Sequence, residues 1–316
     1  MNYSDIHTAI REWYATNGRH DLPWRNTDDP YIIYISEMML QQTQVKTVLD
    51  RHFHPFLKRF PTLRHIKEAK LDDVLHAWQG LGYYRRARYI YATAQIAAPK
   101  LPTDPAELVK LPGIGKSTAH AIAAFSSHRP VAVLDANVKR ILCRFFAKKS
   151  AAPKALWEMA EVLLDRKEPY IYNQAMMDIG STVCTPKSPS CHLCPLQSGC
   201  MGQSDPIRFP QKRVKKPRPV RYRKLACVRN ETGLLMRQRK GELLGGLWEL
   251  PELDEMETTA EKIGEVTHEY SHFKLVAELY ESNNRNLPGT LVTYENLTTI
   301  PTSSLEKKIF EKLKLL

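Results

Sequence analysis

The sequence lacks the apolar run that a membrane-spanning helix needs, because no stretch approaches about 18 to 20 consecutive apolar residues. It also lacks the charged start, apolar centre and small-residue cleavage site of a signal peptide. The N-terminal segment MNYSDIHTAIREWY instead has the apolar spacing of an amphipathic helix. These absences exclude membrane and secreted proteins, and we expect a soluble intracellular protein.

Acidic residues are in short supply. Asp and Glu number 34 against 46 Lys and Arg, which gives a formal net charge of +12 and a pI near 9.3. An excess of this size predicts a polyanionic partner, with nucleic acid favoured over a membrane surface. The length of 316 residues favours two or three domains over one core.

Cysteine is scarce except in one place. Cys143 and Cys227 are isolated, whereas the other four form the pattern C-x6-C-x2-C-x5-C at Cys184, Cys191, Cys194 and Cys200. In a reducing compartment such a cluster predicts metal ligation by thiolates, to Zn²⁺ or to an iron–sulfur cluster. Zinc ribbons usually carry two CxxC pairs and this pattern has one, which favours [4Fe–4S].

From residue 1 to about 200, apolar residues recur at three- and four-residue spacings, which predicts helices almost throughout. The expected helices cover residues 5–17, 30–48, 71–79, 84–97, 105–111, 116–126, 136–147, 154–164 and 170–181. We therefore assign residues 1–204 to a first, helical domain.

A basic, proline-rich segment follows the helical region. Residues 206–224 hold nine basic residues and no acid, so we expect 205–224 to be a linker, either a solvated hinge or a direct phosphate contact. Beyond it, segments such as GLLMRQ and FKLVAELY alternate apolar and polar residues as strands do. Residues 225–316 should form an α+β domain that ends in a short helix.

Two glycines lie between expected helices in LPGIG, residues 111–115. Gly113 and Gly115 allow a tight turn whose backbone N–H groups converge beside a helix N-terminus, which suits a phosphate. The alternative is an ordinary glycine cap between packed helices. The basic charge balance favours the phosphate.

Residues 79–90, QGLGYYRRARYI, place two adjacent tyrosines between a Gly-Leu-Gly turn and several arginines. Aromatic rings beside cations suit stacking on bases near phosphates. The alternative is a pair of core tyrosines on a helix whose surface is basic.

Two carboxyls stand out. Glu37 lies in ISEMMLQQTQV, an expected buried helix in which an acid and three glutamines are unfavourable unless they are paired or used. Asp135 lies where an apolar stretch meets a helix start, a usual place for a helix cap. We expect a raised pKa for Glu37 and a lowered pKa for Asp135, a division that suits an acid and an anionic stabiliser. Nothing in the sequence itself brings the two together.

Together these stretches resemble the helix–hairpin–helix DNA glycosylases, and within them the adenine DNA glycosylases of the MutY type. The matching pieces run through LPWR, SEMMLQQTQV, GLGYYRRAR, LPGIGKST, LDANVKR and NQAMMDIG to the four cysteines. GGLWELP at 245–251 and YSHFKL at 270–275 resemble the C-terminal domain of that family. The resemblance implies a multidomain protein: an all-helical glycosylase core with a [4Fe–4S] cluster loop, plus a Nudix-like α+β C-terminal domain.

The resemblance also implies roles for single residues. Glu37 matches the acid that protonates a flipped adenine, and Asp135 matches the aspartate that stabilises the oxocarbenium-like sugar. The adenine pocket is expected to include Trp24, Arg25, Gln174 and Ser117. The expected DNA contacts are Gln42, Thr43, Leu81, Tyr83, Gly113, Gly115 and Lys139, with Gln42 filling the gap at the orphaned base and Tyr83 wedged into the duplex.

Relatives of the endonuclease III type, which also cut the strand, carry a nucleophilic lysine in the second half of the hairpin. The corresponding residue here is Ser117, and Lys116 is one position out of register. The resemblance therefore implies a monofunctional glycosylase, with Lys139 as the source of only a slow, adventitious lyase reaction.

The expected C-terminal domain departs from the family at one point. The usual Phe-Ser-His reads Tyr270-Ser271-His272, which adds a hydroxyl at the expected 8-oxoguanine contact. From the alternation alone, YSHFKL would be a strand with alternate residues packed inward. The domain lacks the glutamate cluster of GX5EX7REUXEEXGU, so we expect no Mg²⁺-dependent nucleotide hydrolysis.

We therefore expect a monomeric base excision repair enzyme, a hydrolase of N-glycosyl bonds. It would excise adenine paired with 8-oxoguanine or guanine in double-stranded DNA, in a bacterial cytoplasm and at the nucleoid. One alternative is an endonuclease III-type glycosylase and AP lyase, against which Ser117 and the C-terminal domain argue. The other is a non-catalytic iron–sulfur DNA-binding regulator, which gives no reason for Glu37 or Asp135.

Overall fold

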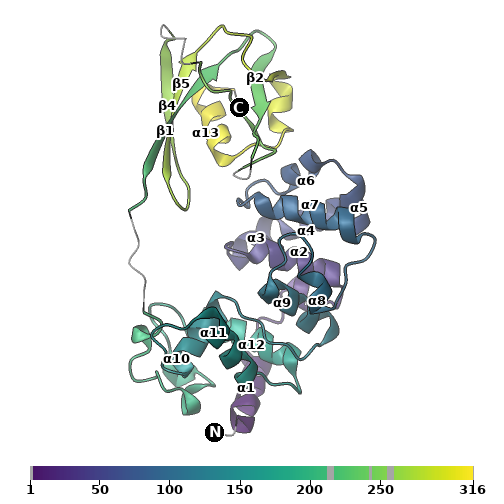
Figure 1. The fold of residues 1–316 in the computed structure, drawn as a ribbon, viewed down its shortest axis with the longest axis vertical. Coiled ribbons are helices and arrows are strands. Elements are labelled where there is room, and N and C mark those ends of the chain that lie inside the picture. Colours follow the sequence, from purple (N-terminus) through teal and green to yellow (C-terminus); the bar gives the residue numbers. More distant parts are fainter. Residues whose placement is uncertain (1–2, 212–216, 242–243, 255–259, 316) are drawn as a thin grey trace. The chain divides into compact units, whose positions relative to one another are not determined.

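The computed structural model of the protein describes residues 3–211, 217–241, 244–254 and 260–315 (Figure 1). The chain divides into two compact units, each assembled from two stretches of sequence. The first unit combines Met1–Val45 with Ile96–Val214, and the second combines Lys46–Gln95 with Lys215–Leu316. The helical region expected over residues 1–204 is therefore shared between the two units.

The first unit is helical. Its helices are α1 (Ser4–Asn17), α2 (Pro30–Leu40), α8 (Pro105–Leu108), α9 (Lys116–Ser127), α10 (Ala136–Phe145), α11 (Pro153–Leu163) and α12 (Pro169–Thr182), with the 3₁₀ turns η1 (Pro23–Arg25), η2 (Cys191–Leu193), η3 (Gln197–Gly199) and η4 (Pro206–Arg208). Asp29 caps α2 by accepting the Tyr31 N–H at 2.8 Å, directly before a proline at the first helical position.

One apolar core holds much of this unit together. Helices α1, α10, α11 and α12 share it, and Figure 1 shows them grouped together. Its fully buried members include Ile10, Leu142, Met176 and Ile179. Each such side chain contributes about 1.5 to 3 kcal/mol. Helix α2 packs against α9, and α12 against α10 and α1.

The second unit begins with short helices. They are α3 (Val45–Arg51), α4 (Phe53–Arg59), α5 (Leu63–Glu68), α6 (Leu71–Ala77) and α7 (Arg85–Ala97). The first residue of α3 and the last two residues of α7 belong to the first unit. Trp78, Phe53 and Phe56 are fully buried among them. Across the described residues of both units, no helix is long and apolar enough to cross a membrane.

The rest of the second unit contains two small sheets. In the first, β1 (Val220–Cys227) pairs in parallel with β5 (Lys274–Glu281), which pairs antiparallel with β4 (Lys262–Glu269). In the second, β2 (Gly233–Gln238) lies between β3 (Trp248–Glu249) and β6 (Thr290–Thr293), antiparallel to both. Helix α13 (Ser304–Lys312) packs against β4, and η5 (Glu295–Thr298) follows β6.

The helices expected from periodicity are confirmed, with one correction. A single helix over residues 30–48 is wrong, because α2 ends at Leu40, Gln42 has the positive φ of 61°, and α3 begins at Val45. The three glutamines of this stretch therefore lie in a break between helices, where Gln42 and Gln44 are exposed. Exposure removes the free-energy penalty that a buried glutamine would carry.

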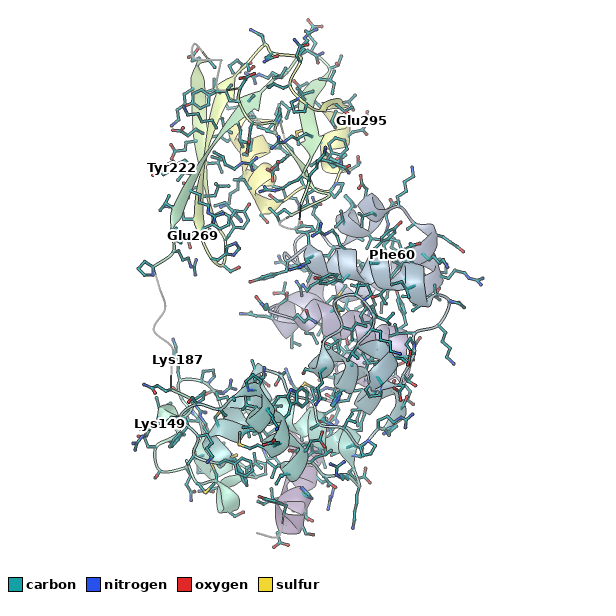
Figure 2. The ribbon with its side chains drawn as sticks, viewed as in Figure 1. Phe60, Lys149, Lys187, Tyr222, Glu269 and Glu295 are labelled. Carbon is teal, nitrogen blue, oxygen red and sulfur yellow. The ribbon has the colours of Figure 1, made fainter. Side chains whose placement is uncertain are left out.

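Two expectations for the C-terminal region also need correction. Strand β1 begins at Val220, so the end of the expected linker is strand, while residues 212–216 lie outside the described residues. YSHFKL is not one strand, because residues 270–273 connect β4 to β5 and only Lys274 and Leu275 belong to β5. Glu269, labelled in Figure 2, is the last residue of β4.

Candidate active site and cysteine loop

Two carboxyls that no sequence spacing places together share one site. Glu37 lies in the last turn of α2, and Asp135 lies at the N-cap of α10. Burial, the larger cause, and the negative charge of Asp135 raise the pKa of Glu37 to about 7, while the charge of Arg25 opposes the shift. Asp135 and Arg25 thus each lie within electrostatic reach of Glu37, and the raised pKa leaves Glu37 able to carry a proton near neutral pH.

The expected lowering of the Asp135 pKa is wrong. Burial raises the pKa of Asp135 above its usual range and outweighs the N–H groups of Val138 and Asn137, which favour the ionised form. The cap itself is present, since Asp135 Oδ1 accepts the Val138 N–H at 2.7 Å. The desolvation of this carboxyl comes from the helices packed around it, so its position at a helix start alone predicted the wrong direction of the pKa shift.

Arg25, expected in the adenine pocket, makes a buried ion pair. Its Nη1 and Nη2 donate to the two oxygens of Asp178 at 2.7 and 2.8 Å. Arg19 Nε donates to the same carboxylate at 2.7 Å. Burial opposes ionisation of Asp178, but the hydrogen bonds and charges of Arg25 and Arg19 hold its pKa below the usual range. The sequence reasoning missed Asp178, although a lone acid in the apolar stretch NQAMMDIG was a usable signal.

Ser117, the residue at the lysine position of lyases, supports the chain next to Asp135. Its Oγ accepts the Leu134 N–H at 3.3 Å, directly before Asp135. Lys116 points away, as expected from its register, with its Nζ 4.1 Å from the centroid of the Trp157 ring. A hydroxyl here can orient a neighbour, whereas it cannot form a Schiff base.

The other expected pocket residues are buried. Trp24 lies in η1 and Gln174 in α12, and both side chains are almost inaccessible. They come from segments far apart in the sequence, and both belong to the first unit. Neither side chain faces solvent in this structure.

Several expected DNA contacts of the first unit are accessible. Gln42, Gly113, Gly115 and Lys139 are exposed, and Thr43 is half-buried. Gly113 has φ 73°, which favours glycine, and the space around Gly115 is open to 4 Å. Gln42 adopts φ 61° without being glycine, and such strained positions cluster at functional sites.

The adjacent tyrosines of the second unit have different environments. Tyr83 is 45 % exposed and has φ 47°, whereas Tyr84 is 4 % exposed and its hydroxyl donates to the Thr302 carbonyl at 3.1 Å. The alternative that these tyrosines are core residues therefore holds for Tyr84 and not for Tyr83. Leu81, an expected DNA contact, is only 5 % exposed in this structure.

The loop of residues 270–273 places its serine beside Tyr83. The Tyr83 hydroxyl donates to Ser271 Oγ at 3.2 Å, within the second unit. Tyr270 is half-buried against the apolar core and lies 4.7 Å, centroid to centroid, from Phe273. His272 packs on the same ring, at 4.8 Å. Two sequence motifs that were assigned separately thus meet.

The four clustered cysteines also converge. Burial raises the pKa of Cys194 to about 12, with further increases from the three neighbouring thiols at 184, 191 and 200. No group of three or more such side chains among the described residues is arranged for a single metal ion. Four cysteine thiols that influence one another electrostatically are the donor set that a [4Fe–4S] cluster uses. Lys187, labelled in Figure 2, lies between the first two cysteines.

Two arginines of α10 hold the cysteine loop. Arg144 Nη1 donates to Cys184 Sγ at 3.2 Å and to the Thr185 carbonyl at 2.8 Å. Arg140 Nε donates to the Cys184 carbonyl at 2.8 Å, and Arg140 Nη2 donates to Asn137 Oδ1 at 3.0 Å. The first cysteine of the cluster is therefore fixed to α10 through both its backbone and its sulfur.

A chain of polar contacts links the cysteine loop to the carboxyl site. Asn137 Nδ2 donates to Asp135 Oδ2 at 3.3 Å, which completes the connection that begins at Cys184 and Arg140. A Cβ at Gly180 would lie 2.5 Å from the Asn137 Cβ, so the absence of a side chain lets α12 approach α10 closely here. The sequence reasoning missed Asn137 and Arg140, both within the matched stretch LDANVKR.

Comparison with known families identifies the fold and the cysteine loop. The profile of the HhH-GPD superfamily base excision DNA repair proteins matches residues 35–165. The profile of the iron–sulfur binding domain of endonuclease III matches residues 184–200. Among solved structures, a thermostable thymine-DNA glycosylase is 27 % identical with a TM-score of 0.58, over 62 % of this chain and 94 % of that one. A non-covalent endonuclease III–DNA complex shares the fold at 20 % identity and a TM-score of 0.56, over 66 % of this chain and 99 % of that one.

Fold and family profiles together define a base excision repair DNA glycosylase with a helix–hairpin–helix core and a [4Fe–4S] binding loop at the four cysteines, and its curated relatives make it a hydrolase of N-glycosyl bonds. Curated relatives narrow the class. An adenine DNA glycosylase of Buchnera aphidicola from Acyrthosiphon pisum is 33 % identical over 88 % of this chain and 89 % of its own length. The one from Schizaphis graminum is 42 % identical, over 66 % of this chain and 62 % of that protein. The rat enzyme is 32 % identical, over 98 % and 79 %.

The chain belongs to the adenine DNA glycosylase family. Neither a strand-cutting lyase nor a non-catalytic regulator is favoured by these relatives.

Proposed function

We propose that this protein excises adenine mispaired with 8-oxoguanine or guanine, as a monomer on double-stranded DNA. The observation that carries the proposal is the pair of carboxyls, in which Glu37 has a pKa of about 7 and lies within electrostatic reach of Asp135. A general acid works best when its pKa is near the working pH. An adenine leaving group needs such a proton, because the neutral base leaves more easily than its anion.

In the proposed reaction, the target nucleotide leaves the helix and enters a pocket formed by Trp24, Arg25 and Gln174. Glu37 donates its proton to the purine ring, and the electrons of the N-glycosidic bond pass to the departing base. The ionised Asp135 stabilises the oxocarbenium-like sugar. Water then adds to the sugar carbon and gives its proton to the Glu37 carboxylate, which leaves free adenine, an abasic site and the acid restored.

The strand should remain intact after excision. Ser117 replaces the nucleophilic lysine of lyases, so no enzyme-bound imine is formed at that position. Lys139 is exposed in the first turn of α10, three positions after Ala136. Its amine can condense with the aldehyde of the abasic site, and this supports a slow adventitious reaction rather than a built lyase site.

Two residues in strained backbone conformations support insertion into the duplex. Gln42 and Tyr83 both have positive φ and exposed side chains, which suits groups that replace or separate bases. The turn at Gly113 and Gly115 would hold a phosphate through its backbone N–H groups. When bound, the iron–sulfur cluster supplies a rigid centre that positions its loop, including Lys187, for the DNA backbone.

Residues 225–316 are proposed to form a Nudix-like domain that recognises the base opposite adenine. An 8-oxoguanine differs from guanine by an O8 acceptor and an N7–H donor, and a serine hydroxyl is the right size to contact that edge. Ser271 is the candidate, with Tyr270 and His272 beside it, and its hydrogen bond to Tyr83 supports the assignment. The basic segment from 205 to 224 would contact phosphates.

Single-turnover excision on A:8-oxoguanine and A:G duplexes tests the catalytic assignment. With alkali after the reaction, the wild type should give strand breaks, and without alkali it should give almost none. Glu37→Gln should retain mispair binding and lose several orders of magnitude in rate, because the amide has no proton to transfer. Asp135→Asn should be similarly impaired. Glu12→Gln, an exposed glutamate of α1, is the matched control. Near-normal turnover by Glu37→Gln would refute the proposal.

The recognition assignment has its own test. Ser271→Ala combined with Tyr270→Ala should lower the preference for 8-oxoguanine over guanine, on the scale of about 1 to 3 kcal/mol for missing base-edge contacts. Thr293→Ala, which removes an exposed hydroxyl of β6, is the control. If the double variant keeps the wild-type preference, the opposite base is read elsewhere.

A further inference from the structure

The residues on either side of Tyr83 are fastened to a single residue of the C-terminal region. The Tyr84 hydroxyl donates to the Thr302 carbonyl at 3.1 Å. Gln79 Nε2 donates to the same carbonyl at 3.2 Å and to Thr302 Oγ1 at 2.9 Å. Thr302 is 2 % exposed, so these bonds are sheltered from water. The turn that presents Tyr83 is therefore held from both sides.

Thr302 forms a parallel bridge with Trp248 and lies directly before the N-cap of α13. The next residue, Ser303, caps α13 by accepting the Leu305 N–H at 3.1 Å, and its hydroxyl donates to the buried carboxyl of Glu306. Tyr270 packs against the apolar core that includes Leu305 and other residues of α13. Thr302 therefore directly precedes the cap of a helix whose residues belong to the same apolar core as Tyr270.

Other polar contacts would keep the two parts of this unit docked if the Thr302 bonds were lost. Asp72 of α6 accepts Gln238 Nε2 at 3.0 Å and Trp248 Nε1 at 3.4 Å. Arg88 Nη1 donates to the Gly241 carbonyl at 3.0 Å. The bonds at Thr302 are therefore placed to set the alignment of Tyr83 and Ser271 rather than to create the docking.

We propose that Gln79, Tyr84 and Thr302 are positioning residues that align Tyr83 with Ser271 and thereby set the specificity for the base opposite adenine. The inference rests on the proposed roles of Tyr83 and Ser271. These three residues are not among the proposed base contacts, and they would act through the tyrosine and the serine. Both base-contacting groups would then be placed by one buried joint before DNA binds.

The double variant Tyr84→Phe with Gln79→Leu tests the effect on specificity in the full-length, cluster-containing protein. It removes the hydrogen bonds to Thr302 and keeps the apolar volume. We expect the ratio of excision rates on A:8-oxoguanine and A:G to fall about 5- to 10-fold, which is the net value of about one of the three hydrogen bonds removed, with the A:G rate changed less than about twofold. Tyr91→Phe, the same chemical change farther along α7, should leave the ratio unchanged. An unchanged ratio in the double variant, or equal losses on both duplexes, would overturn the proposal.

Hydrogen exchange in the absence of DNA separates this proposal from the proposed function. The Tyr270 N–H donates to the Phe273 carbonyl at 2.9 Å and reports on the loop. The double variant should accelerate exchange both in residues 270–274 and around Tyr83, whereas Tyr91→Phe should accelerate neither. If the loop does not respond, the joint is wrong even where specificity falls. If the loop responds but the wild type shows no preference for 8-oxoguanine, the reading role of Ser271 is wrong, and with it the claimed effect on specificity.

Discussion

The excision rate should follow the ionisation of Glu37. The pKa of this carboxyl is raised from 4.5 to about 7, chiefly by burial and next by the charge of Asp135. At pH 7 about half of the molecules would carry the proton, against about 0.3 % for a carboxyl of pKa 4.5, a gain of roughly 150-fold or about 3 kcal/mol. The site thus supplies a working acid at a pH where an exposed glutamate would supply almost none.

The measurement is a single-turnover pH profile with enzyme in excess and saturating, on an A:8-oxoguanine duplex at constant ionic strength. Above about pH 8 the rate should fall close to tenfold per pH unit, because only the protonated fraction of Glu37 reacts. Burial also raises the pKa of Asp135, whose ionised form is needed, so a second loss of rate should appear on the acidic side. The profile should therefore be bell-shaped.

Two results would refute this reasoning. A rate that stays constant through about pH 9 would mean that no group with the pKa of Glu37 controls the reaction. A rate that already falls as the pH rises through values below about 5 would mean that Glu37 titrates as an exposed carboxyl in the working complex. DNA binding measured at each pH is the control, because weaker binding would otherwise imitate a loss of catalysis.

Three further outcomes are expected. The pKa of Glu37 is raised in the folded state, so its ionisation destabilises the fold as the pH rises from about 4.5 through about 7. Glu37→Gln should therefore raise the free energy of unfolding at pH 8, by no more than about 3 kcal/mol, and should leave it unchanged at pH 4.5. The purified protein should be yellow-brown with iron near four atoms per chain, and stoichiometric zinc would contradict the assignment. Cys194→Ser should lose iron and DNA affinity, whereas Cys143→Ser and Cys227→Ser should keep the metal content. Arg25→Met should lower the free energy of unfolding by about 3 kcal/mol, because the buried carboxylate of Asp178 loses its bidentate ion pair. Urea denaturation measures this loss, and an unchanged urea midpoint would mean that the ion pair does not stabilise the fold.

Features that depend on neighbouring residues were available from the sequence. The period of apolar residues predicted most helices, and Asp29 before Pro30 predicted the start of α2. The spacing of the four cysteines predicted a metal site, because ligands so close in sequence can converge without help from the rest of the fold. The local sequence singled out Glu37 as an acid in an apolar helix and Asp135 as a helix cap, the resemblance to adenine DNA glycosylases gave them roles, and spacing alone did not bring them together.

Features that depend on long-range packing were not available. Helix α4 is short, and its apolar residues become informative only where Phe56 packs on Trp78. Strand β4, KIGEVTHE, has weak alternation and is defined by its pairing with β5. The break after Leu40 was also not predicted, because the periodic pattern of the sequence continues through the glutamines although the helix ends before them.

The chemical groups of this protein, and the residues at which most of its helices begin, can therefore be read from the order of its amino acids. Folding sets the environments of those groups: the desolvation that raises the pKa of Asp135, the ion pair between Arg25 and Asp178, and the exposure of Tyr83 beside a buried Tyr84. The difference is one of range. Helix formation and capping act over a few residues, whereas desolvation and ion pairing depend on atoms that are far apart in the sequence until the chain folds.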